Sequence, residues 1–186
     1  MKTLFVFATR MENHLGGMPD GEGDVLITGI GKSNAAYGLA KKLREGHFER
    51  VVNLGICGAV DEGIPLGSIF SIRKVVEGDR LFSGRPSFFE IPVIPESSFP
   101  SAVLVTQDGV MRSEKQRNHI KGLGAMLCDM ECFALAGVAA QFKIPFFAFK
   151  AVSDHAEENA HEAAMKNATR VSKELCRQIF NLFFSG

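Results

Sequence analysis

The sequence has no tryptophan, one tyrosine and only four cysteines in 186 residues. None of these cysteines forms a Cys-x-x-Cys pair, and the five histidines do not complete a zinc pattern with them. We therefore expect no metal site, and thiols that stay reduced and mostly buried. No apolar stretch is as long as a membrane span, and no signal-peptide cleavage site follows the short apolar N-terminus. The sequence thus predicts a cytoplasmic protein with no membrane partner.

An excess of either charge is also missing, since lysine and arginine number 21 and aspartate and glutamate number 21. This balance excludes a generally basic nucleic-acid-binding protein and an acidic disordered tail. Hydrophobic residues make up 46% of the chain, with 19 glycines and 16 phenylalanines. Such a composition fits a globular α/β protein whose Phe rings fill the core and pocket walls. The length suits one unit, so we expect a single domain over residues 1–186.

Short apolar runs alternate along the chain with stretches of helical periodicity. Strands are predicted at residues 3–8, 24–28, 50–54, 68–76, 102–105, 125–129 and 146–152, and helices at 34–45, 113–121, 131–142 and 162–184. The strand at 50–54 is expected to end at a glycine turn over residues 55–58. Residues 77–101 hold four of the seven prolines and are expected to be mostly loop. Alternating strands and helices predict a largely parallel sheet between helical layers.

A glycine-rich turn, Gly29-Ile30-Gly31-Lys32-Ser33, joins a predicted strand to a predicted helix. A P-loop needs a further glycine where this chain has Leu26, and a dinucleotide fingerprint needs one where it has Asn34. Neither phosphate-binding motif is complete. Two interpretations remain. The glycines only shape the turn, or they bring the backbone close to a bound group at the helix N-terminus.

Acidic residues follow three of the predicted strands. Glu12 follows the first strand, Asp129 and Glu131 flank the end of the strand at 125–129, and Asp154 follows the strand at 146–152. The carboxyl ends of parallel strands line the ligand crevice of an open α/β sheet, and unpaired buried charge is unfavourable. Taken alone, each acid also fits a helix N-cap, especially Asp129 and Asp154. Together, their placement favours a shared site.

Five segments carry a family resemblance: Ala8-Thr9-Arg10-Met11-Glu12, Ile27-Thr28-Gly29-Ile30-Gly31-Lys32-Ser33-Asn34-Ala35-Ala36, Asn53-Leu54-Gly55-Ile56-Cys57-Gly58, Asp129-Met130-Glu131 and Val152-Ser153-Asp154. In this order they resemble the purine nucleoside phosphorylase superfamily. The likeness is greatest to its hydrolytic branch, the 5′-methylthioadenosine/S-adenosylhomocysteine nucleosidases and the futalosine hydrolases. The resemblance implies a three-layer α/β/α sandwich around a twisted, mixed, mostly parallel sheet, assembled as a homodimer or higher oligomer. We expect no cofactor.

The resemblance also implies roles for individual residues. Asp154 is the general acid that protonates the purine at N7, and Glu12 positions and deprotonates the attacking water. Glu131 accepts hydrogen bonds from the ribose hydroxyls, Met130 packs on the sugar, and Ser153 supports the acid. These roles agree with the chemistry, because cleavage of an N-ribosidic bond develops positive charge on the sugar and negative charge on the base.

Two further substrate-binding positions depart from the family pattern. Ile56 stands where methylthioadenosine nucleosidases usually carry serine, and Val110 stands where an aromatic residue usually stacks on the base. Futalosine hydrolases often have asparagine where this chain has Asp154. The chain is also shorter than usual members, mainly between residues 12 and 24 and around 79–101. The base and the 5′ substituent of the substrate therefore stay open.

Three functions are compatible with the sequence. Hydrolysis of a purine-type nucleoside is favoured by Glu12, a base for water. Phosphorolysis would need convergent arginines for phosphate, and the sequence offers Arg10 and Arg73 but no arginine near residues 55–59. A nucleoside-binding protein that has lost catalysis is the third alternative, because a fold does not fix a function.

Overall fold

The structure, a computed structural model, describes residues 2–16, 21–82, 85–94, 97–109, 113–155 and 160–184. In chain order its elements are β1 (Thr3–Phe7), β2 (Gly23–Ile27), α1 (Lys32–Glu45), β3 (Arg50–Ala59), β4 (Ile69–Phe82), β5 (Arg85–Glu90), β6 (Ser101–Thr106), α2 (Glu114–Gly122), β7 (Leu127–Asp129), α3 (Cys132–Phe142), β8 (Phe146–Asp154) and α4 (Ala160–Phe184). No helix within these ranges is both long and apolar enough to cross a bilayer.

The strands form one mixed sheet, part of which closes on itself. β3, β7, β6, β4 and β8 pair in a cycle, because β8 joins β3 on one side and β4 on the other. β1 and β2 extend the sheet from β3 in parallel, and β5 extends it from β4 in antiparallel orientation. The expected mixed α/β sheet is therefore present. The expected three-layer sandwich is correct only in part, because the closed cycle of strands makes a barrel and not a flat central layer.

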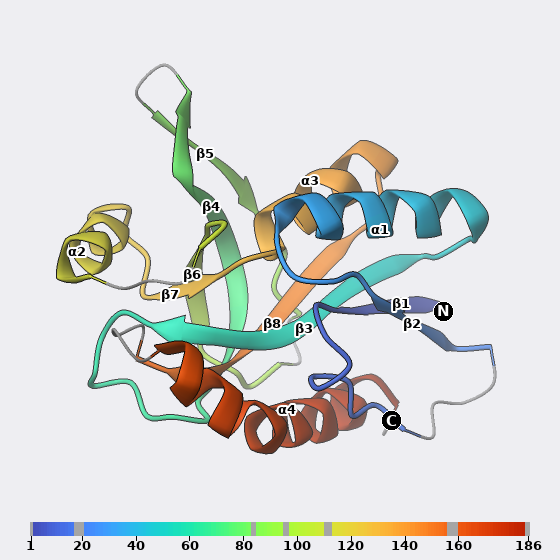
Figure 1. Cartoon of the computed structure of the whole chain (residues 1–186). Coiled ribbons are helices and arrows are strands. Elements are labelled where there is room, and N and C mark those ends of the chain that lie inside the picture. Colours follow the sequence, from blue (N-terminus) through green and yellow to red (C-terminus); the bar gives the residue numbers. More distant parts are fainter. Residues whose placement is uncertain are drawn as a thin grey trace.

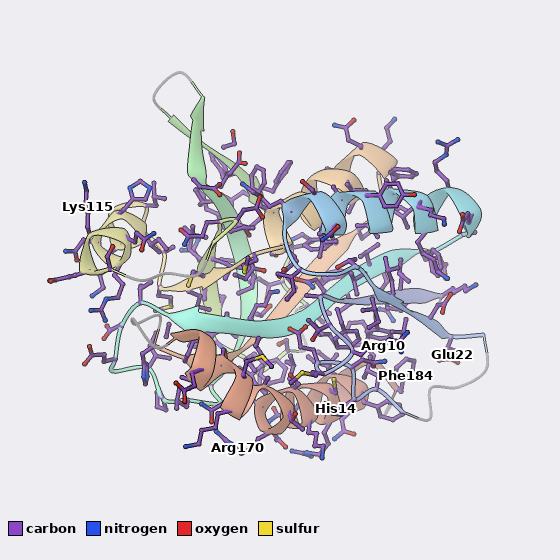
Figure 2. The ribbon with its side chains drawn as sticks, viewed as in Figure 1. Arg10, His14, Glu22, Lys115, Arg170 and Phe184 are labelled. Carbon is purple, nitrogen blue, oxygen red and sulfur yellow. The ribbon has the colours of Figure 1, made fainter. Side chains whose placement is uncertain are left out.

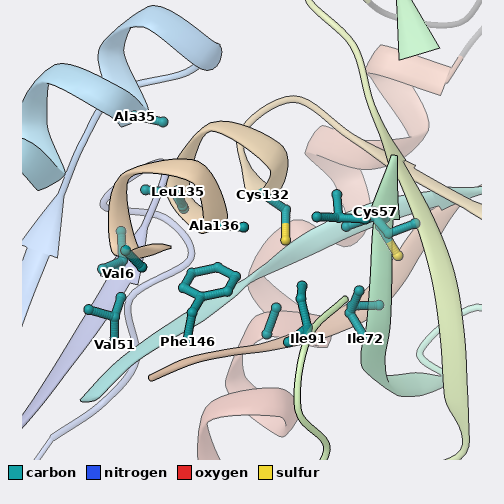
Figure 3. Close-up of a cluster of buried hydrophobic side chains, with 14 of the residues drawn as sticks. Val6, Ala35, Val51, Cys57, Ile72, Ile91, Cys132, Leu135, Ala136 and Phe146 are labelled. Carbon is teal, nitrogen blue, oxygen red and sulfur yellow. The ribbon is translucent and has the colours of Figure 1, made fainter. Parts of the chain in front are cut away.

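Helices cover two opposite sides of this sheet, with α1 and α3 on one side and α4 on the other (Figure 1). Between the sheet and α1 and α3 lies a cluster of buried side chains that includes Val6, Leu135 and Phe146 (Figure 3). Phe5 and Phe149 belong to a second cluster, which packs against the apolar stripe of α4. Charged side chains such as Lys115 on α2 and Arg170 on α4 lie on the outside (Figure 2). Removing both apolar faces from water stabilises the two-sided arrangement.

Two predicted loops are strands in the structure. β3 does not end at residue 54 but runs through both glycines to Ala59, because its backbone continues to pair with β8. Within residues 77–101, β4 continues to Phe82 and β5 pairs back onto it. Pro86 is tolerated there because β5 is an edge strand, where a missing N–H need not break a ladder. Among the described residues between β5 and β6, the backbone is irregular at 91–94 and 97–100, and there the loop prediction is correct.

The predicted helix ends are largely correct. Ser113 is the N-cap of α2, where its hydroxyl accepts a hydrogen bond from the Gln116 backbone N–H at 3.3 Å, and Gly46 is the C-cap of α1. Gly29 and Gly31 adopt φ values of 89° and 94°, which side chains rarely allow. The glycines of the strand-to-helix turn are therefore required by its backbone.

Lys143, at the end of α3, is a site for stabilisation. It is the C-cap in the left-handed region, with φ 57° and ψ 36°, and its side chain is exposed. A side chain costs about 1 kcal/mol there relative to glycine, so we expect Lys143→Gly to raise the free energy of unfolding by about that amount. Urea unfolding measures it. Lys166→Gly, at an exposed interior position of α4, is the control and should lower the same quantity by about 1 kcal/mol. A destabilised Lys143→Gly would contradict the prediction.

Candidate active site

A cavity of about 200 Å³ opens where the carboxyl ends of several strands meet. Its walls come from the turn after β1, the second half of β3, the turns after β2, β6 and β7, the end of β8 and one face of α4. These segments are far apart in the sequence. They are brought together by the closed cycle of β3, β7, β6, β4 and β8 and by the pairing of β1 with β2 and β3. The cavity therefore lies where the closed part of the sheet meets its β1–β2 extension.

Most of the residues singled out from the sequence line this cavity: Glu12, Ile56, Met130, Glu131, Ser153 and Asp154. The three acids that follow different strands thus share one space, and each of them is at least 90% buried. Val110 lies outside the described residues, although nearby Gly109 contributes to the wall.

Hydrogen bonds fix both carboxylate oxygens of Glu12. Oε2 accepts from the Thr9 backbone N–H at 2.8 Å and from the Thr9 hydroxyl at 2.9 Å, and Oε1 accepts from the Ile56 backbone N–H at 3.1 Å. Donors of this kind stabilise the ionised carboxylate. Glu12 is thereby held as an acceptor at the cavity wall, between the turn after β1 and the middle of β3.

Glu131 meets the glycine-rich turn. Its Oε1 accepts a hydrogen bond from the Gly31 backbone N–H at 2.8 Å, at the N-terminus of α1. The backbone of the glycine-rich turn therefore binds a carboxylate of the protein itself. Burial, followed by the nearby Asp129 carboxylate, raises the pKa of Glu131 to about 7. Its charge consequently changes close to neutral pH.

Asp154, at the end of β8, is contacted by the adjacent serine. The Ser153 hydroxyl lies 2.7 Å from Asp154 Oδ2 and 3.2 Å from the Cys57 carbonyl oxygen. The Ser153 carbonyl accepts from Asn167 Nδ2 at 2.9 Å, which ties this strand end to α4. The carboxyl group thus has a defined place beside a hydroxyl that can either donate to it or turn away from it.

Asp129 has a different environment from the other acids. Its Oδ2 lies 2.8 Å from Lys150 Nζ and accepts from the Cys132 backbone N–H at 3.0 Å, and its Oδ1 accepts from the Thr106 hydroxyl at 2.5 Å. The N-cap of α3 is Glu131, so the N-cap interpretation of Asp129 is wrong in position. Asp129 accepts from the first N–H of α3 from two residues before that cap. The buried Lys150 was not assigned a partner from the sequence, although a lysine within an apolar strand is itself a signal of a buried carboxylate.

Other chemistry finds little support in the described part of the chain. No group of three or more His, Cys, Asp and Glu side chains there could hold a metal ion. Burial raises the pKa of the Cys128 thiol to about 12 and that of Cys57 above its usual range. These thiols are not activated nucleophiles, since nucleophilic attack needs the thiolate.

Comparison with known proteins agrees with this geometry. Residues 98–182, which include Met130, Glu131, Ser153 and Asp154, match the model of the Phosphorylase superfamily. A 5′-methylthioadenosine/S-adenosylhomocysteine nucleosidase of Staphylococcus epidermidis is 29% identical over 182 residues, covering 80% of each chain. Residues 98–182 are thus similar to this superfamily, and the likeness to a nucleosidase extends over most of the chain.

Solved structures extend the likeness from this superfamily segment to the whole fold. A nucleosidase of the same name from Colwellia psychrerythraea, in complex with adenine, superposes with a TM-score of 0.85 at 21% identity, covering 98% of this chain and 94% of the other. A futalosine hydrolase mutant of Helicobacter pylori gives a TM-score of 0.81 at 16% identity, covering 96% of each chain. The fold of these solved structures is thus retained almost from end to end.

Proposed function

We propose that this protein hydrolyses the N-ribosidic bond of a purine-type nucleoside and releases the base. The observation that carries the proposal is the convergence of Glu12, Glu131 and Asp154 on one cavity from three separate strands. The curated relatives are nucleosidases by name, and one structural neighbour holds adenine. The substrate is of the methylthioadenosine, adenosylhomocysteine or futalosine type.

Asp154 is the general acid in this proposal, and Ser153 assists it. The single Ser153 proton has two acceptors within reach, Asp154 Oδ2 and the Cys57 carbonyl. When the hydroxyl donates to the carbonyl, its oxygen can accept from a protonated Asp154. Once Asp154 has given its proton to the purine, the hydroxyl can turn and donate to the new carboxylate. The serine thus serves both protonation states of the acid.

Glu12 and Glu131 act on the sugar side. Glu12 faces the cavity as a fixed carboxylate, suited to orient a water and take its proton as the C–N bond breaks. Glu131 keeps one oxygen on Gly31 and offers the other to the ribose hydroxyls. Met130 and Ile56 supply apolar wall, Met130 against the sugar. Both carboxylates stabilise the positive charge that develops on the sugar.

Hydrolysis is preferred to phosphorolysis on the composition of the cavity. No arginine or lysine occurs among the described residues that line it. Arg10 and Arg73, the two arginines considered from the sequence, are exposed and do not belong to the lining. Phosphate capture uses convergent cations, so a water nucleophile fits this site better.

We also propose that the protein acts as a homodimer of a single domain over residues 1–186. Met11, Ile30 and Met165 line the cavity and are 41%, 55% and 50% exposed, which leaves an apolar rim at its mouth. On the β4–β5 hairpin, Phe88 is 52% exposed, whereas Phe89 packs against Phe133. Exposed apolar groups of this kind often mark contacts between chains.

The test of the proposed function is release of free base from a panel of nucleosides: methylthioadenosine, adenosylhomocysteine, futalosine, adenosine and inosine. Each is assayed with and without inorganic phosphate. We expect release from at least one of them that does not depend on phosphate and yields the free sugar. A sugar 1-phosphate as product would establish a phosphorylase instead, and binding without release would leave a nucleoside-binding protein.

Gly55 gives a sharp test of the position of Glu12. A Cβ on Gly55 would lie 3.0 Å from Glu12 Oε1 and 3.2 Å from Lys150 Nζ. We expect Gly55→Ala to displace Glu12 and to lower base release by roughly 10²-fold, because small misplacements of catalytic groups have effects of that size. Gly122→Ala, where no atom lies within 4 Å of the new Cβ, is the control. Full activity of Gly55→Ala would show that the position of Glu12 is not critical.

A further inference from the structure

Lys150 and Asp129 form an ion pair at the wall of the cavity, which Asp129 lines. Lys150 is only 1% exposed, and its ammonium group lies 2.8 Å from Asp129 Oδ2. Burial is the largest single influence and lowers the pKa of Lys150. Asp129, Cys132 and Glu131 together outweigh it and raise the pKa, so the side chain stays charged. Two opposite charges without access to water interact strongly with any other charge nearby.

The other charges nearby are the carboxylates on the sugar side of the proposed site. Lys150 Nζ and Glu12 Oε1 flank the same point, the place of the missing Cβ of Gly55, at 3.2 and 3.0 Å. Lys150 also acts on Glu131, where it opposes the effect of Asp129. A glycine at position 55 is what allows the lysine and Glu12 to approach each other.

We propose that the Asp129–Lys150 pair is a positioning element of the reaction, in which Lys150 keeps Glu131 ionised and fixes the position of Glu12 beside Gly55, and Asp129 limits how much positive charge the sugar side of the cavity experiences. The inference rests on the proposed function, since it assigns these two carboxylates to the sugar. Neither Asp129 nor Lys150 is placed on the substrate. They act through the two glutamates.

The opposing charges explain why both partners are needed. A lysine without a partner would pair directly with Glu12 and Glu131 and would oppose the positive charge that develops on the sugar. An aspartate without the lysine would add a negative charge and favour the protonated form of Glu131. Hydrogen bonds from Thr106 and Cys132 hold Asp129 where it can balance Lys150.

The groups that face Glu131 come from every element packed around it. Asp129 belongs to β7 and Lys150 to β8, Glu12 follows β1, the Cys132 thiol lies at the start of α3, and the Gly31 N–H lies at the start of α1. Of these, only Lys150 carries a positive charge. The Gly31 N–H also favours the ionised form. Removing either member of the ion pair therefore changes the charge that Glu131 experiences, and does so in opposite directions.

The test compares Lys150→Met with Asp129→Asn. We expect Lys150→Met to raise the midpoint of the acid limb of kcat/KM by roughly 1 pH unit, because a stabilising cation is lost. Asp129→Asn should lower that midpoint by about 1 pH unit and should reduce kcat more than KM. Carbon-13 NMR of the glutamate carboxyls follows the titration of Glu131 without any substrate, and the Glu131 signal is assigned by its loss in Glu131→Gln. The titration midpoint of Glu131 should rise in Lys150→Met and fall in Asp129→Asn.

Three matched variants separate charge from structure. Thr106→Val removes the hydrogen bond from the Thr106 hydroxyl to Asp129 without changing any charge. It should lower the melting temperature and leave the midpoint of the acid limb unchanged. Lys150→Arg keeps the charge and should also leave it in place. The neutral double variant Asp129→Asn/Lys150→Met should have a midpoint between those of the two single variants, and it replaces either single variant that fails to fold.

The proposal would be overturned, even if base release is established, if the two single variants shift the midpoint in the same direction or if the Glu131 titration does not shift at all. If the wild-type protein releases no base but the Glu131 titration still moves in opposite directions in the two single variants, only the proposed function would be overturned.

Discussion

Replacing Asp154 with asparagine is expected to lower base release by roughly 10²–10⁴-fold, the usual effect of losing a positioned general acid. Asparagine has nearly the same shape and can still hydrogen-bond to Ser153, so the fold should persist. It cannot deliver a proton, and the purine would have to leave as an anion. The measurement is kcat for Asp154→Asn and wild type on the best substrate of the panel, with circular dichroism to verify folding.

A second substrate makes this experiment specific for the role of Asp154. A nucleoside with a good leaving group needs less protonation, so Asp154→Asn should retain far more of its activity on that compound than on the natural purine. Asp61→Asn is the matched control, because Asp61 is an exposed acid whose contact to the Gly63 N–H asparagine can also make. Equal losses on both substrates, or near-normal turnover on a purine nucleoside, would remove Asp154 from the role of acid.

Glu12→Gln is expected to have an effect of similar size, roughly 10²–10⁴-fold on kcat, because the amide cannot accept the proton of the attacking water. KM should change little, since the proposed role of Glu12 is toward water and not toward the nucleoside. One cost in stability is also expected. Both oxygens of Glu12 accept hydrogen bonds from the protein, and the amide NH₂ cannot accept. One buried donor is left without its acceptor, which costs about 1–3 kcal/mol.

The kinetic and stability effects of Glu12→Gln can be distinguished. Urea unfolding gives the stability, and kcat is then measured well below the unfolding range. Glu45→Gln, at an exposed position near the end of α1, changes the same functional group far from the cavity and should leave both quantities unchanged. A Glu12→Gln protein that is destabilised but turns over normally would show that Glu12 only anchors the turn after β1.

Patterns among neighbouring residues in the sequence predicted most of the helices and strands and most of the residues that line the cavity. Helical periodicity placed α1 and α3 within two residues of their ends, and the helix predicted at residues 113–121 lies within one residue of the ends of α2. The positions of Glu12, Glu131 and Asp154 after apolar strands predicted that they would meet, because the ends of parallel strands share one edge of a sheet. These signals depend on neighbours in the chain, and a single sequence contains them.

The partners across the sheet were decided by the tertiary structure. Glycines at positions 55 and 58 indicate a turn when taken alone, yet β3 passes through them because β8 lies alongside and satisfies its backbone. Prolines indicate a loop at 77–101, yet β5 forms where β4 offers an edge. Closure of the sheet follows from β8 pairing with two strands at once, which no periodicity in one strand encodes.

The sequence by itself determined which residues are candidates for the chemistry: four acids that follow three strands, and a glycine turn. Only the folded chain decided which groups each of them contacts. The glycine turn donates to Glu131, Asp129 accepts from the first N–H of α3 and pairs with Lys150, and Gly55 leaves room for Lys150 beside Glu12. The physical reason is that backbone preference acts over a few neighbouring residues, whereas the energy of a buried charge depends on which distant groups surround it.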